Sequence, residues 1–191
     1  MKIKEIDTRF QLYQELPKGG VGAEIGVCRG LNAMQLYHVA KPSKLYLCDA
    51  WMEKVPDGKG TSWTRIEDSS LWYGDHEELV TSLFKQEIEE GKVETRRQFG
   101  GDFLYSLEDN SLDWVYLDAD HNYSAVDIEI SLSLRKVKSN GFIMGHDYVV
   151  GPITWGCGVI RAVNERINSG ELRMEALTLE VYSSFLCRVV K

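Results

Sequence analysis

Five short apolar runs alternate along this chain with segments whose apolar residues recur at helical spacing. The runs are typical of strands buried inside a sheet, and they cover residues 21–27, 44–49, 92–99, 112–117 and 141–144. Neighbouring parallel strands need a long crossover, which is usually a helix. The alternation therefore predicts an α/β fold built on a doubly wound, mostly parallel sheet.

Two further β-like runs, residues 176–181 and 185–190, flank Ser183-Ser184 near the end of the sequence and predict an antiparallel C-terminal hairpin. The expected sheet therefore has seven strands. A length of 191 residues suits one domain, residues 1–191, better than two. Residues 52–74 have no clear period and contain Pro56, Gly58 and Gly60, so we expect an irregular insertion there.

One segment gives conflicting signals. Residues 126–134 alternate apolar and polar side chains, which favours a strand, but Val126, Ile130 and Leu134 also fit one helical stripe. The segment lies between two buried runs, where a parallel sheet needs a crossover. We therefore expect a helix.

The composition limits the classes of partner. The chain has 22 Lys and Arg residues against 29 Asp and Glu residues, a formal net charge of −7, and no extended basic cluster. This balance repels phosphate backbones, so we expect no nucleic-acid partner. No stretch has the length of a membrane-spanning helix, and the four cysteines are scattered. We expect a cytoplasmic protein without a membrane partner.

The turn after the first run carries Glu24, Gly26 and Gly30. Glycines let a backbone approach a ligand closely. The middle glycine of a dinucleotide fingerprint is missing, and an acid at Glu24 would repel a pyrophosphate but suits a cationic ligand. Asp49, which ends the second run, can accept hydrogen bonds from ribose hydroxyls. Together these residues favour S-adenosylmethionine as the cofactor; a tight turn with an incidental acid is the alternative.

A second group of polar side chains follows the fourth and fifth runs. Asp118, Asp120 and His121 come after the fourth run, and His146 and Asp147 after the fifth. These strands are expected to be neighbours, so the five side chains should converge at one edge of the sheet. Such a crowd of acids and imidazoles is costly unless a cation or a proton-transfer role occupies it.

The sequence motifs EIGVCRG (24–30), LCDAW (47–51), GDF (101–103), LDADHNY (117–123) and GFIMGHDY (141–148) occur in this order. With them the chain resembles class I S-adenosylmethionine-dependent methyltransferases over about residues 19–150. It is most similar to small O-methyltransferases of the macrocin type and more distantly similar to catechol O-methyltransferase. The resemblance implies a Rossmann-like fold and methyl transfer to a hydroxyl of a small molecule or a sugar.

The resemblance also implies roles for individual residues. Glu24, Gly26 and Gly30 would line the methionine and ribose moieties, and Asp49 would bind the ribose hydroxyls. Asp102 and Phe103 would border the adenine, although Asp102 could instead be a helix N-cap. Cys28 departs from the family pattern, because many members have a second glycine there.

By the same resemblance, Asp118, His146 and Asp147 would hold a divalent ion, Mg²⁺ or Mn²⁺. His146 replaces the usual carboxylate, and its nitrogen suits Mn²⁺, Fe²⁺ or Zn²⁺ at least as well as Mg²⁺. Asp120, and after it His121, is the candidate catalytic base that removes the acceptor's proton.

Three other functions stay open at this point. The chain could be a metal-independent methyltransferase of the same fold, or a binding module that retains the cofactor pocket without catalysis. A nicotinamide oxidoreductase is the weakest of the three, because the glycine spacing does not fit. The sequence determines neither the acceptor nor the oligomeric state, and a homo-oligomer stays open.

Overall fold

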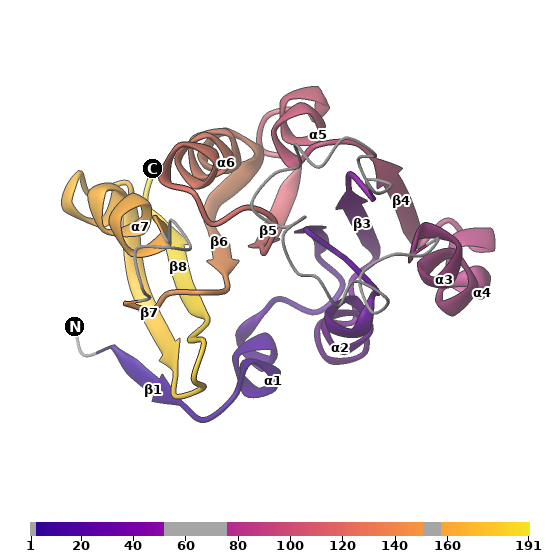
Figure 1. Cartoon of the computed structure of the whole chain (residues 1–191), viewed down its shortest axis with the longest axis horizontal. Helices are drawn as coiled ribbons and strands as arrows, with labels where there is room; N and C mark the ends of the chain where they lie inside the picture. The colour runs from indigo at the N-terminus through magenta and orange to yellow at the C-terminus, as the bar shows by residue number, and fades with distance from the viewer. Residues whose placement is uncertain (1–2, 52–75, 151–157) are drawn as a thin grey trace, which may run out of the picture.

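The computed structural model describes residues 3–51, 76–150 and 158–191 (Figure 1). The strands of these residues form one eight-stranded sheet of order β1-β7-β8-β6-β5-β2-β3-β4. They are β1 (Lys4–Ile6), β2 (Val21–Ile25), β3 (Lys44–Asp49), β4 (Val93–Arg97), β5 (Leu112–Leu117), β6 (Val137–Gly145), β7 (Leu172–Thr178) and β8 (Phe185–Val189). The predicted insertion at 52–74 lies outside the described residues.

The helices connect the strands and cover both faces of the sheet (Figure 1). They are α1 (Arg9–Leu12), the 3₁₀ turn η1 (Tyr13–Glu15), α2 (Leu31–Ala40), α3 (His76–Leu83), α4 (Lys85–Glu89), α5 (Gly100–Ser106), α6 (Tyr123–Lys136) and α7 (Val159–Asn168). Helices α5, α6 and α7 cover one face, and α1 and α2 lie on the other. Among the described helices, none is long and apolar enough to cross a lipid bilayer.

The predicted fold class is confirmed. Strand β2 pairs in parallel with β3 and β5, and β5 pairs in parallel with β6. Strand β8 runs antiparallel to both β6 and β7, as expected for the C-terminal hairpin. The sheet has one strand more than predicted, because the polar segment Lys4–Ile6 pairs with β7 at the edge. Three residues at an exposed edge leave no apolar run to detect.

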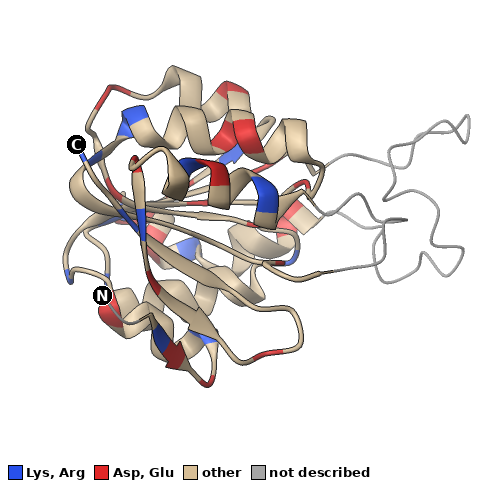
Figure 2. Ribbon diagram, turned by 90° about the vertical axis from the view of Figure 1, so that its left-hand side faces the viewer, with Lys and Arg blue, Asp and Glu red and all other residues tan. Residues whose placement is uncertain are grey.

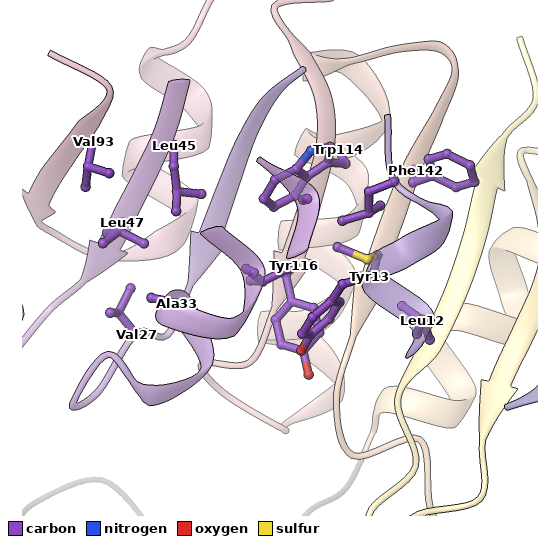
Figure 3. Close-up of a cluster of buried hydrophobic side chains, with 14 of the residues drawn as sticks. Leu12, Tyr13, Val27, Ala33, Leu45, Leu47, Val93, Trp114, Tyr116 and Phe142 are labelled. Atoms are coloured by element: carbon purple, nitrogen blue, oxygen red, sulfur yellow. The ribbon is translucent and has the colours of Figure 1, made fainter. Parts of the chain in front are cut away.

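Alternate residues of β5 divide the interior into two cores. Trp114 and Tyr116 point into the core under α1 and α2, which Figure 3 shows in close-up. Val115 and Leu117 point into the core under α5, α6 and α7. A central strand that is buried on both faces reads as a continuous apolar run, as observed here.

The ambiguous segment 126–134 is helical, as context predicted. It forms the body of α6, whose buried side includes Val126, Glu129 and Ile130. Ile128 is exposed and produces the strand-like alternation without contributing to the core. The crossover requirement therefore outweighs the local period here.

Candidate functional site

The carboxyl ends of β2, β3, β5 and β6 meet at one edge of the sheet. The register places Ile25 beside both Cys48 and Leu117, and Leu117 beside Gly145. The residues that follow these strands therefore gather at the same edge, where ligands of open α/β sheets bind. They form two groups: the first follows β2 and β3, and the second follows β5 and β6.

Glu24 is the most unusual side chain of the first group. It is completely buried in β2, and its Oε1 accepts a hydrogen bond from Asn32 Nδ2 at 3.0 Å. Asn32 is in turn held by the Tyr13 hydroxyl at 2.6 Å from its Oδ1. Among the described residues, Glu24 Oε2 has no partner. Burial, followed by the nearby Asp118 and Asp49, raises the pKa of Glu24 well above its usual value. An uncompensated buried acid of this kind favours a cationic or hydrogen-bond-donating ligand.

Gly26 and Gly30 shape the turn between β2 and α2. Both have a left-handed backbone, with φ of +89° and +79°. A Cβ atom on Gly26 would lie 2.2 Å from the backbone oxygen of Asp118, so the turn touches the strand end of the second group. Cys28, the departure from the expected family pattern, also has a positive φ, of 51°. The turn therefore needs the conformations that glycine adopts most easily.

Asp49 organises the same turn from the end of β3. Its Oδ2 accepts the Cys28 N–H at 2.8 Å, and its Oδ1 accepts the Trp51 N–H at 2.8 Å. The Trp51 indole N–H donates to the Cys28 carbonyl at 2.9 Å. A carboxylate offers about four lone-pair sites, so two backbone donors leave room for ribose hydroxyls.

Asp102 and Phe103 lie in the first turn of α5, which covers the edge of the first group. The helix begins at Gly100 and its N-cap is Phe99, so the alternative role of Asp102 as the N-cap is wrong. Asp102 is exposed, whereas the Phe103 ring is buried, and its centre lies 5.6 Å from that of the Tyr46 ring. The Phe103 side chain therefore packs in the core beneath the start of α5.

The second group is a compact cluster of acids and imidazoles. Asp118, His121 and Asp147 each offer one ligand atom, and these atoms lie within 4.8 Å of one another. His121 Nε2 lies 2.6 Å from Asp147 Oδ2 and 3.7 Å from Asp118 Oδ1. The convergence of β5 and β6 thus brings together side chains from both strand ends. Such a set can bind a divalent ion through two carboxylates and one imidazole.

Within this cluster His121 and Asp147 shift each other's pKa. Burial alone would lower the pKa of His121, but hydrogen bonds to Asp118 and Asp147 raise it to about 10. Burial alone would raise the pKa of Asp147, but hydrogen bonds from His121 and His146 lower it below its usual range. A metal ion bound by these three residues would have to displace the proton from His121.

His146 lies beside the cluster and differs from His121 in its second nitrogen. Its Nδ1 lies 3.3 Å from Asp147 Oδ2 and 3.6 Å from Asp118 Oδ1. Its Nε2 lies 2.5 Å from Nη2 of Arg9. Burial alone would lower the pKa of His146, but hydrogen bonds to Asp118 and Asp147 raise it to about 9.

Arg9 is a residue of the site that the sequence did not reveal. It is the first residue of α1, and both its backbone N–H and its Nε bond to the Glu180 carboxylate, at 3.0 and 3.4 Å. A single arginine in a short polar segment carries no recognisable motif. Only the pairing of β1 with β7 brings it to the end of β6.

Asp120 points to the start of α6. Its Oδ1 accepts hydrogen bonds from the backbone N–H and the Nδ2 of Asn122, at 2.8 and 2.7 Å, and Asn122 is the N-cap of α6. Its Oδ2 has no hydrogen bond among the described residues. Nearby Glu129 is buried, and burial, with the charge of Asp120, raises the pKa of Glu129 to about 8.

Solved structures with a similar fold include three methyltransferases. They are an O-methyltransferase from Bacillus cereus in complex with SAH (16% identity, TM-score 0.63, covering 95% of this chain and 78% of that one), a precorrin-6y C5,15-methyltransferase from Geobacter metallireducens (11%, 0.61, 96% and 86%), and an rRNA methylase from Streptococcus thermophilus (8%, 0.60, 96% and 95%). At these identities the similarity establishes the fold alone.

No match was found among curated proteins. A family model described as "Methyltransferase domain" matches residues 23–148, which is well over half of the chain. The matched segment contains the turn after β2, the end of β3, and both strand ends of the acid–imidazole cluster. The chain therefore belongs to the methyltransferase-domain family.

Proposed function

We propose that this protein is an S-adenosylmethionine-dependent methyltransferase that methylates a hydroxyl of a small molecule or a sugar, with help from a divalent metal ion. One observation carries the proposal: the buried, partly unpartnered carboxyl of Glu24 lies at the same sheet edge as the cluster of Asp118, His121 and Asp147. A cationic ligand bound at Glu24 would therefore lie next to a cluster that can bind a metal ion.

The residues of the first group suit the cofactor. Glu24 would accept hydrogen bonds from the ammonium end, and Asp49 would accept them from the ribose. The left-handed backbone at Gly26 and Gly30 would let the chain lie against the ligand without a side chain in the way. Asp102 would lie at the adenine edge. When bound, S-adenosylmethionine would supply an electrophilic methyl group.

The residues of the second group suit the acceptor. Asp118, His121 and Asp147 would hold the metal, which would lower the pKa of the acceptor hydroxyl. We choose His121 beside the two carboxylates because its ligand atom belongs to this compact set, whereas His146, the ligand of our sequence expectation, lies next to it with Nδ1 3.3 Å from Asp147 Oδ2. Asp120 would remove the acceptor's proton, since its Oδ2 is free of hydrogen bonds among the described residues. A base placed in this way typically contributes about 10²–10⁴-fold to the rate.

Calorimetry tests the cofactor half of the proposal. Wild-type protein should bind both S-adenosylmethionine and SAH, and Asp49→Ala should weaken binding at least tenfold, because it loses both the ribose acceptor and the support of the turn. Asp109→Ala removes an exposed acid that precedes β5, at the end of the strand away from the site; it is the matched control and should bind normally. No binding of either ligand at high micromolar concentration would rule out the proposal.

A methyl-acceptor screen tests the other half. A panel of catechols, other phenols and sugars should contain an acceptor whose labelling requires Mg²⁺ or Mn²⁺ and stops on chelation. Labelling that survives exhaustive chelation would favour the metal-independent alternative. Ribosomal RNA belongs in the same screen, because an rRNA methylase has this fold. Figure 2 shows acidic and basic residues interspersed rather than a basic band, and the net charge is −7, so we expect no RNA labelling.

A further inference from the structure

A chain of hydrogen bonds leads to Glu24 from a segment that precedes the matched domain, which begins at residue 23. Tyr13 belongs to the 3₁₀ turn η1 and is completely buried. Its hydroxyl donates to Asn32 Oδ1 at 2.6 Å, and Asn32 Nδ2 donates to Glu24 Oε1 at 3.0 Å. The other oxygen of this carboxyl, Oε2, is buried without a partner among the described residues. The chain of hydrogen bonds therefore ends at an unpartnered carboxyl oxygen of the first group.

The packing of the core does not explain the Tyr13 hydroxyl. The Tyr13 ring lies edge-on to the Tyr116 ring, with 5.8 Å between the ring centres, and Figure 3 shows the two side chains together in the core. The Tyr116 hydroxyl has a partner of its own, the Ser184 hydroxyl at 3.3 Å. A phenylalanine in place of Tyr13 would fill the same space without a polar group to satisfy. The hydroxyl therefore needs an explanation other than packing.

The bond from Tyr13 fixes the direction of the Asn32 amide. An asparagine side chain has an oxygen, which only accepts hydrogen bonds, and an NH₂ group, which only donates them. Because the Tyr13 hydroxyl donates to the oxygen, the NH₂ group is turned toward Glu24. It occupies Oε1 and leaves Oε2 for a ligand. A cation at Oε2 would favour the ionised carboxyl and so oppose burial, which raises the pKa of Glu24.

We propose that Tyr13 is a positioning residue for the cofactor: through Asn32 it holds the Glu24 carboxyl so that Oε2 receives the ammonium group of S-adenosylmethionine. The identity of this ligand rests on the proposed function above, whereas the positioning of Glu24 does not depend on it. Asn32 lies in the first turn of α2, directly after the turn that carries Gly30. The same hydrogen bonds therefore attach the N-terminal segment to the turn that we assign to the cofactor, and a satisfied buried network of this kind is rigid.

Proton–nitrogen NMR of the full ¹⁵N-labelled chain tests the positioning without any ligand. An Asn32→Ala variant assigns the side-chain amide signals of Asn32. In the wild type, the amide proton bonded to Glu24 should appear downfield of the amide protons of exposed asparagines. Tyr13→Phe keeps the ring and removes the hydroxyl. In this variant the proton should move upfield, because the amide is no longer held against Glu24.

Binding measurements with two ligands test the consequence for the cofactor. Methylthioadenosine has the nucleoside of SAH but lacks its amino-acid end. Tyr13→Phe should weaken SAH binding about three- to tenfold, the usual worth of one hydrogen bond. It should change the binding of methylthioadenosine less than twofold, because this ligand has no ammonium group for Glu24. Calorimetry measures SAH, and competition with SAH measures the weaker ligand. General damage to the fold would weaken both ligands equally.

A double-mutant cycle shows whether Tyr13 acts through Glu24. In the Glu24→Gln background, Tyr13→Phe should weaken SAH binding less than twofold further, because the carboxyl that it positions is gone. Tyr37→Phe is the matched control. It removes a hydroxyl from α2, where the Tyr37 ring lies edge-on to Phe84 and away from this network. It should leave both SAH binding and the Asn32 signals unchanged.

The inference is overturned if the Asn32 signals are the same in the wild type and in folded Tyr13→Phe. It is also overturned if this variant weakens SAH and methylthioadenosine equally, or if its effect on SAH is as large in the Glu24→Gln background. A wild type that binds no SAH but shows the expected Asn32 shift would disprove the proposed function and leave the positioning of Glu24 by Tyr13 intact.

Discussion

The two groups at the sheet edge are built by different means. The group after β2 and β3 depends on backbone conformation, with positive φ at Gly26, Cys28 and Gly30 and an acid, Asp49, that bonds to backbone N–H groups. The group after β5 and β6 depends on ionised side chains that meet from distant parts of the chain. Arg9 and His146 are 137 residues apart. The comparison teaches that the first group is a local property of the sequence and the second a property of the whole fold.

Asp147→Asn should have the largest effect, and it should affect methyl transfer without affecting cofactor binding. The amide cannot hold a cation as the carboxylate does, so we expect methyl transfer to fall by roughly 10²-fold or more. SAH binding should change less than twofold, because the first group is untouched. Turnover assays and calorimetry on the same preparation measure both quantities. Equal loss of SAH affinity would mean that the two groups act as one unit.

Gly26→Ala should damage both groups together, because this glycine is their point of contact. The new Cβ would lie 2.2 Å from the Asp118 carbonyl oxygen, in a left-handed backbone. We expect a loss of about 3 kcal/mol or more in the free energy of unfolding, measured in urea, and loss of SAH binding.

Gly19→Ala is the matched control for this substitution. Gly19 has a similar φ of +73° but open space around its Cβ position. The control should lose only about 1 kcal/mol of stability. Equal losses of stability in the two variants would mean that the close approach at Gly26 does not contribute to the cost of a Cβ atom there.

Glu129→Gln should change how the stability of the protein depends on pH. Glu129 lies on α6, and its Oε1 is 2.5 Å from the Cβ position of Gly100. Its pKa of about 8 exceeds the usual 4.5, so the neutral acid stabilises the fold below about pH 4.5, and this stability is lost as pH rises toward 8. Between pH 5 and pH 9 the wild type should lose on the order of 2 kcal/mol relative to the glutamine variant, in urea unfolding at both pH values. A constant difference between the two proteins would contradict a neutral Glu129.

Cys28→Gly should have the smallest effect. Glycine accepts the φ of +51° without a side-chain penalty, so we expect up to about 1 kcal/mol of added stability and unchanged SAH binding. Asn140→Gly, at φ +63° on β6 and away from the site, is the control. Its gain should be smaller, because asparagine tolerates this conformation better than cysteine does. A less stable Cys28→Gly variant would mean that the thiol contributes packing that the backbone argument omits.

The same contrast explains what the sequence could predict. The doubly wound sheet, the hairpin and the helical character of α6 follow from periodicity and from the crossover rule, and the structure confirms them. The proximity of Asp118, His121 and Asp147 followed from the neighbouring order of β5 and β6. Which nitrogen of each histidine faces a carboxylate did not follow, since it depends on side-chain geometry.

Features made by long-range pairing were missed for a physical reason. Strand β1 and Arg9 owe their positions to β7 and Glu180, and neither segment has an apolar period of its own. The alternative role of Asp102 as an N-cap is wrong, because α5 begins at Gly100, after the apolar N-cap Phe99. Asp102 is the third residue of the helix. The roles of the individual site residues remain predictions until ligands are bound.

The fluorescence of Trp51 can report ligand binding at the turn after β2. Its indole is bonded to the Cys28 carbonyl, inside the turn that we assign to the cofactor, whereas Trp114 is sealed in the core. A ligand that presses on this turn changes the polarity around Trp51, one of the five tryptophans of the chain. The difference in emission between the wild type and Trp51→Phe would therefore follow occupancy of the turn in real time, without an acceptor.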